Sequence, residues 1–75
     1  MGNIPTISGK KLLRLLLKNG YRARRKKGSH VFVESREGTY GTVIPIHGNE
    51  DLGIGLLRSI LNHLDLSIDD LKRML

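Results

Sequence analysis

The chain has 75 residues, of which 39% are hydrophobic, a net charge of +6 and no cysteine. This length allows a single domain, residues 1–75, with a small core, and the lack of cysteine excludes disulfides and thiolate zinc sites. The longest apolar run is far shorter than the roughly 20 residues that span a bilayer, and the N-terminus has no signal-peptide core, so we expect a cytoplasmic protein with no membrane partner.

The positive charge is concentrated in the first half of the chain. Residues 1–33 contain nine lysines and arginines and no acid, whereas all seven acids lie between Glu34 and Asp70. A cationic segment without neutralising acids favours a polyanionic partner: nucleic acid first, an anionic membrane or acidic protein second. A basic face that contacts only solvent is the alternative.

A first helix is predicted over residues 10–20. Ser8 is a suitable N-cap, and Lys11, Arg14 and Lys18 recur along one polar face. The opposite, apolar stripe is formed by Leu12, Leu13, Leu16 and Leu17, with Leu15 widening it. This helix therefore has a core side and a basic side.

Residues 21–26 alternate in the manner of a strand. The alternation predicts Tyr21, Ala23 and Arg25 on one face of a sheet. The other face would then carry three cations, Arg22, Arg24 and Lys26.

Two further strands are expected. Residues 27–29 reverse the chain, and residues 30–35, rich in valine with one phenylalanine, form the second strand. A turn at residues 36–38 precedes a third strand over residues 40–46, where Pro45 must lie at the end or on an edge because it cannot donate to a ladder. The prediction is a three-stranded antiparallel meander.

The C-terminal part is predicted to be helical. A polar loop leads to an amphipathic helix over about Ile54–His63, and Ser67 with Asp70 approximates a capping box that opens a short last helix. The order α-β-β-β-α, plus the short C-terminal helix, favours a small two-layer α+β fold with one open sheet face.

His30 is the candidate catalytic residue. Cleavage of RNA without a metal needs proton donors and acceptors together with cations that stabilise the transition state. Histidine suits either proton role because its unperturbed pKa is about 6.5, and His30 follows four consecutive cations and the Gly28-Ser29 turn. The alternative is a histidine at a strand end that only forms a hydrogen bond in the turn.

The other two histidines are weaker candidates. His47 follows the third strand and could face the same sheet surface as His30, as a second proton carrier or a phosphate contact. The alternative is a loop residue that positions RNA or a partner. His63 lies near the end of the second long helix, where its role is structural. No nucleotide-binding loop, serine-nucleophile elbow or metal-ligand cluster is found, so we expect no metal and no cofactor.

Four segments follow one another in a characteristic order. They are residues 12–20 with the basic strand after them, Lys27-Gly28-Ser29-His30, Val43-Ile44-Pro45-Ile46-His47, and Gly55-Leu56-Leu57-Arg58-Ser59-Ile60-Leu61. Together they cover nearly the whole chain and resemble the HicA toxin family, also called YcfA-like proteins.

This resemblance implies a double-stranded-RNA-binding-domain-like fold and a metal-independent ribonuclease that acts on mRNA. It implies that His30 is catalytic and that a HicB-type antitoxin masks the active face. Residues 67–75 are similar to the C-terminal extension of some members, which implies contacts with the antitoxin or within a homodimer. Ile46 separates Pro45 from His47, which are often adjacent in the family, so on a continuing strand His47 would face the opposite side from the family's histidine.

The function expected is therefore an endoribonuclease toxin with His30 as general acid or base. Candidate RNA contacts are Lys11, Arg14, Lys18, Arg24, Lys26, Lys27, Ser29 and His47. A non-catalytic double-stranded-RNA reader and a domain that binds an acidic protein are the alternatives.

Overall fold

The computed structural model describes residues 3–75, which form three strands and three helices. Their bounds are α1 Gly9–Lys18, β1 Arg22–Lys27, β2 His30–Glu34, β3 Gly41–Pro45, α2 Ile54–His63 and α3 Ile68–Met74. The predicted element order is confirmed, and the strand and helix ends differ from the prediction by at most two residues. The sequence predicts an irregular lead-in over residues 1–7, of which residues 1–2 lie outside the described part.

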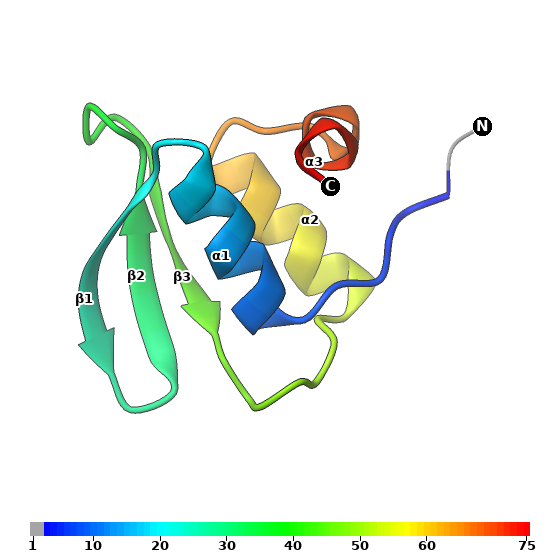
Figure 1. Cartoon of the computed structure of the whole chain (residues 1–75), viewed down its shortest axis with the longest axis horizontal. Coiled ribbons are helices and arrows are strands. Elements are labelled where there is room, and N and C mark those ends of the chain that lie inside the picture. Colours follow the sequence, from blue (N-terminus) through cyan, green and yellow to red (C-terminus); the bar gives the residue numbers. More distant parts are fainter. Residues whose placement is uncertain (1–2) are drawn as a thin grey trace.

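The strands form one antiparallel sheet in the order β1-β2-β3, and the helices lie together on one of its faces (Figure 1). The arrangement is a two-layer α+β fold, as predicted, and is consistent with the double-stranded-RNA-binding-domain type. The face of the sheet away from the helices is called here the open face. No helix in residues 3–75 is long and apolar enough to cross a bilayer.

The core lies between the sheet and the helices. It contains Ile7, Leu12, Leu16, Val31, Val33, Ile44, Leu57, Ile60, Leu61, Leu64 and Leu71, all buried. Of the predicted apolar stripe in α1, Leu17 is the exception, because it is 45% exposed. Successive side chains of an α-helix are about 100° apart around its axis. When Leu12 and Leu16 face the sheet, the side chain of Leu17 therefore points away from it.

Local sequence signals explain where the helices start. The Ser8 hydroxyl accepts a hydrogen bond from the backbone N–H of Lys11, 3.1 Å away, and caps α1. The N-terminus of α3 has a complete capping box between Ser67 and Asp70. By contrast, Gly53 precedes α2 without a side-chain cap.

The face assignment predicted for β1 is wrong, because the strand contains a bulge. Ala23 pairs with Val33, but Arg25 pairs with Phe32, so Arg24 is an extra residue in β1. Directly opposed residues of an antiparallel pair share a face, and an extra residue exchanges the faces beyond it. The bulge therefore places Arg25 on the open face and Lys26 on the helix face.

Candidate nucleic-acid interface

His30 is the first residue of β2 and follows a two-residue turn. Gly28 has a φ of +59°, which is the positive φ that such a hairpin turn needs at its first central position. His30 lies opposite Lys27 on one side and Pro45 on the other, and its side chain is exposed on the open face. The predicted catalytic histidine thus stands at the hairpin end of the sheet, beside a lysine.

Three cations border a cavity of about 920 Å³ on the open face next to His30. They are Arg24, Arg25 and Lys27. The Arg24 guanidinium donates a hydrogen bond of 3.1 Å to Glu34. Glu34 is the one acid among the described residues that line the cavity. Arg25 and Lys27 form no ion pair with any residue in 3–75, so their charge remains available to an anion.

His47 lies beside His30. Their ring centroids are 6.4 Å apart and the ring planes meet at 85°. Pro45 pairs with His30 and shares its face of the sheet, so the alternation of a strand leads from Pro45 to the His30 side at residue 47. The position of His47 therefore agrees with the expectation that it could face the same sheet surface as His30. A hydrogen bond from the Ile46 N–H to the Ser29 carbonyl, 2.6 Å long, holds this segment against the β1–β2 turn.

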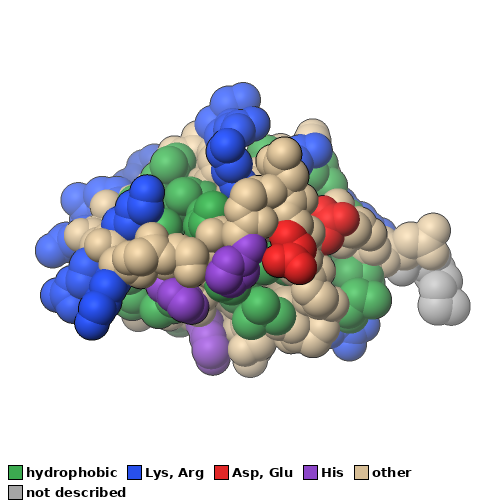
Figure 2. Space-filling view, turned by 90° about the horizontal axis from the view of Figure 1, so that it is seen from below, with side chains coloured by type: hydrophobic (Ala, Val, Ile, Leu, Met, Phe, Trp, Pro, Cys, Tyr) green, Lys and Arg blue, Asp and Glu red, His purple; other side chains and the backbone are tan. Residues whose placement is uncertain are grey.

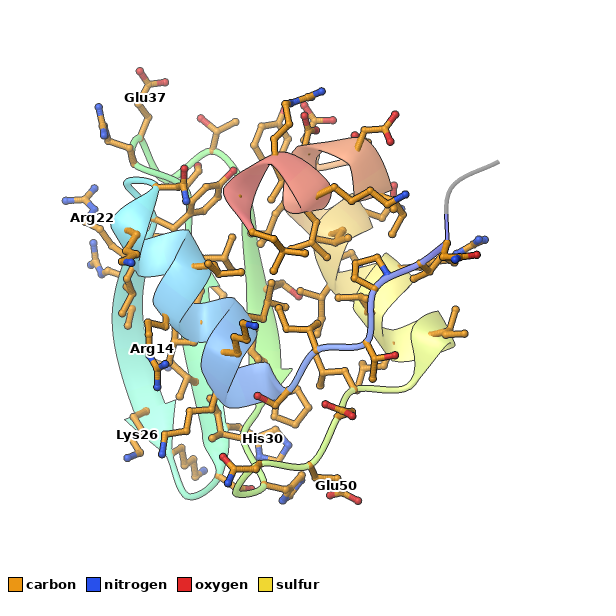
Figure 3. The ribbon with its side chains drawn as sticks, turned by 45° about the vertical axis from the view of Figure 1, so that its right-hand side comes forward. Arg14, Arg22, Lys26, His30, Glu37 and Glu50 are labelled. Atoms are coloured by element: carbon orange, nitrogen blue, oxygen red, sulfur yellow. The ribbon has the colours of Figure 1, made fainter. Side chains whose placement is uncertain are left out.

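Lys26 and Lys27, both candidate RNA contacts, point to opposite faces of the sheet. Lys26 pairs with the buried Val31 and lines a second cavity of about 570 Å³, which also includes Lys10 from α1. Figure 3 shows Lys26 near the hairpin end of β1, with Arg14 of α1 above it. Of the two lysines, only Lys27 shares a face and a cavity with His30.

The other predicted contacts divide between the two sides of the molecule. Lys11, Arg14 and Lys18 are exposed on α1, which packs on the helix face of the sheet, and none of them lines the cavity beside His30. Ser29, in the turn, does line this cavity. The structure therefore places Arg24, Lys27 and Ser29 around the same cavity as His30, whereas the cations of α1 form a separate surface.

His63 has a structural position. It is the last residue of α2, and its Nδ1 lies 3.1 Å from the hydroxyl of the buried Thr42. This hydrogen bond ties the end of α2 to the helix side of β3. It gives Thr42 a partner that a buried polar group requires.

Apart from Glu34, no acid of the described residues lines the cationic cavity on the open face. Viewed from below, lysines and arginines gather at one side, histidines lie beside them, and acids lie beyond the histidines (Figure 2). Glu37 lies at the end of the sheet opposite to His30 (Figure 3). Within residues 3–75, no three histidines or acids come together as a metal site would require.

Two site residues, Arg25 and Phe32, were not predicted as contacts, although both line the cavity beside His30. The Gly28-Ser29 pair is a signal for a two-residue hairpin, and counting back from it places Lys27 and Arg25 opposite His30 and Phe32. The bulge at Arg24 has no comparable signal in the sequence.

Fold and site together define a small α+β domain with a cationic open face and a histidine pair at the hairpin end of its sheet. Residues 9–66 match the family model of the HicA toxin of bacterial toxin–antitoxin systems. Because the match covers most of the 75 residues, the chain belongs to the HicA toxin family. No curated protein and no solved structure matches the chain.

Proposed function

We propose that this member of the HicA toxin family is an endoribonuclease that cleaves mRNA without a metal ion. The observation that carries the proposal is the juxtaposition of His30 and His47, with ring centroids 6.4 Å apart, beside the cations Arg25 and Lys27. Two imidazoles and neighbouring cations are the groups that RNA cleavage by proton transfer requires.

The chemistry is a transfer of the phosphoryl group within the RNA. The 2′-oxygen attacks the adjacent phosphorus while one histidine takes the 2′-hydroxyl proton. The bond to the 5′-oxygen breaks, and the other histidine donates a proton to that oxygen. The products are a 2′,3′-cyclic phosphate and a 5′-hydroxyl end, so no water and no redox partner enters this step.

Arg25 and Lys27 stabilise the phosphate during this reaction. Both share the open face with His30, and neither is neutralised by an acid of the described residues. Positive charge held close to the phosphate lowers the energy of the more highly charged transition state. The same cations repel a divalent metal ion, which supports a mechanism based on side chains alone.

A HicB-type antitoxin is the proposed partner, and it neutralises the toxin by covering the open face around His30. Because the substrate is mRNA, the proposed place of action is the cytoplasm. The C-terminal residues 67–75 remain a proposed contact for the antitoxin or for a second copy of the chain.

The test is cleavage of a long RNA by the purified chain in the presence of a chelator. We expect new 5′-hydroxyl ends with the natural chain and a loss of about 10²- to 10⁴-fold in rate with His30→Ala, the range for one acid–base group. His63→Ala is the matched control, because His63 contacts Thr42 rather than the cavity. Equal rates for the natural chain and His30→Ala would disprove the catalytic assignment.

A non-catalytic reader of double-stranded RNA is the second candidate. It is favoured by the exposed cations Lys11, Arg14 and Lys18, which follow one face of α1 and lie apart from His30. This candidate predicts salt-dependent binding of duplex RNA without new RNA ends. The chelator assay therefore separates the two functions, and lack of RNA binding at moderate salt would favour an acidic protein partner instead.

A further inference from the structure

Phe32 places an aromatic ring on a surface that is otherwise strongly cationic. It lies in the middle of β2, between Arg25 on β1 and Val43 on β3, and all three side chains are on the open face. Phe32 is 36% exposed and Val43 is 45% exposed. No helix of residues 3–75 covers this face of the sheet (Figure 1).

The Phe32 ring leans along the sheet, away from His30. A Cβ atom at Gly41 would lie 2.7 Å from Cζ of Phe32, so the end of the ring occupies the space that a side chain at position 41 would fill. Gly41 pairs with Glu34, two residues beyond Phe32 and farther from His30. The absence of a side chain at Gly41 thus lets the ring lie over the sheet and leaves room between Phe32 and His30.

This room is the cavity of about 920 Å³ beside His30. Phe32 and Val43 supply its apolar part, and Arg25, Lys27 and His30 supply its polar part. Its volume is within the range of about 300–1,000 Å³ that small-ligand sites occupy. An aromatic ring next to unpaired cations matches a nucleotide, whose base stacks on the ring and whose phosphate binds the cations.

We propose that Phe32 is a stacking platform for one unpaired base of single-stranded RNA. The base lies on the Phe32 ring, and the phosphate next to it contacts Arg25 and Lys27. A duplex does not fit this site, because its bases are stacked on each other and their faces are not accessible to a side chain. The further statement that the neighbouring phosphate is the one cleaved at His30 rests on the proposed function.

The absence of tryptophan from the chain allows a direct test. In a His30→Ala background, Phe32→Trp places a single indole at the platform, and a base stacked on it quenches its fluorescence. We expect quenching by single-stranded oligouridylate, but none by duplex RNA or by inorganic polyphosphate of equal charge. No quenching by the oligouridylate, or equal quenching by polyphosphate, would overturn the stacking proposal.

Tyr40→Trp in the same background is the matched control. Tyr40 is an aromatic residue with 43% exposure, it precedes β3 at the end of the sheet away from His30, and it lines a different cavity. Its tryptophan should keep its fluorescence with every one of these polyanions. Quenching at both positions would show that binding is not specific to Phe32 and would contradict the proposal.

Binding and cleavage give separate answers. Phe32→Leu keeps an apolar side chain but loses the aromatic face, so its affinity for single-stranded RNA should fall about tenfold. Quenching in Phe32→Trp together with undiminished cleavage by His30→Ala would support the platform and refute the catalytic role of His30. Cleavage that depends on His30, with no quenching at position 32, would refute the platform alone.

Discussion

The imidazole rings of His30 and His47 face each other edge to face, with centroids 6.4 Å apart, although 16 positions separate them in the sequence. The pair exists because the residue after β3, Ile46, donates its N–H to the carbonyl of Ser29 in the β1–β2 turn. Two histidines at this spacing allow a phosphate to have one proton donor and one proton acceptor at the same time.

The first prediction concerns His47. If it donates the proton to the leaving 5′-oxygen, His47→Ala should lower the cleavage rate by about 10²-fold or more. The measurement is the rate at which new 5′-hydroxyl ends appear on a long RNA in the presence of a chelator.

A substrate with a sulfur atom in place of the leaving 5′-oxygen distinguishes catalysis from binding. Sulfur leaves without protonation, so this RNA should restore most of the rate of His47→Ala but not of His30→Ala if His30 is the base. A defect of the same size with both substrates would assign His47 a role in binding only.

The second prediction compares the two neighbouring lysines of β1. Lys27 shares the open face with His30, and Lys26 points to the helix face. In the His30→Ala background, Lys27→Ala should reduce the slope of log affinity against log salt by about 0.7 for single-stranded RNA, the value for one phosphate contact. Lys26→Ala is the control of equal charge and should leave that slope unchanged. An equal change in both variants would mean that RNA contacts both faces of the sheet.

The third prediction concerns the packing of α1 on β3. A Cβ atom at Gly9 would overlap the carbonyl oxygen of Pro45. Gly9→Ala should therefore destabilise the fold by about 1–3 kcal/mol, the usual cost of overpacking. Urea denaturation followed by circular dichroism measures this change.

Gly55→Ala is the matched control for Gly9→Ala. Gly55 also lies in the first turn of a helix, but no atom of the described residues lies within 4 Å of the position of its Cβ, apart from its chain neighbours and the backbone of its own helix. Alanine there should stabilise the fold by about 0.5–1 kcal/mol, because glycine has the lower helix propensity. A loss of stability in both variants would refute the specific contact between α1 and Pro45.

The fourth prediction concerns the response of α3 to acid. The backbone N–H of Ser67 donates a hydrogen bond to the Asp70 carboxylate and lowers the pKa of Asp70 below its ordinary value of 3.8. The neighbouring Ser67 side chain, and then the Arg73 guanidinium, lower this pKa further. Because the folded state binds this proton less tightly than the unfolded state, the stabilisation is complete above pH 3.8 and is lost as the pH falls through the lower, folded-state pKa.

Asp70→Asn should therefore lower the melting temperature at neutral pH and flatten its decrease in acid. Asp69→Asn, which removes an exposed neighbouring charge, is the control and should retain the acid dependence. Thermal unfolding followed by circular dichroism over the acid range is the measurement. A variant Asp70→Asn with the acid dependence of the natural chain would show that other groups control it.

The elements were predictable because each has a local signal. Ser8 and Ser67 mark helix starts through their hydroxyls, and the Gly28-Ser29 pair marks a hairpin. Apolar periodicity then distinguishes the helices from the strands. These short-range effects are encoded in neighbouring residues, so they determine the order and type of every element.

The relation of side chains to faces was less predictable. The bulge at Arg24 depends on how β1 pairs with β2, and the ion pair between Arg24 and Glu34 forms only across the two strands. Likewise, the closeness of His47 to His30 depends on the hydrogen bond between Ile46 and Ser29. Such pairing arises from contacts between distant segments, and a single sequence contains no direct signal for it.

The composition of β1 has a consequence for self-association. β1 is an outer strand of the sheet, and five of its six residues are cations. An outer strand has unpaired backbone groups that could extend the sheet into a second molecule, but two such strands would bring ten positive charges together. The same residues that favour a polyanion thus oppose edge-to-edge aggregation, and a homodimer of this chain is expected to form through a surface other than β1.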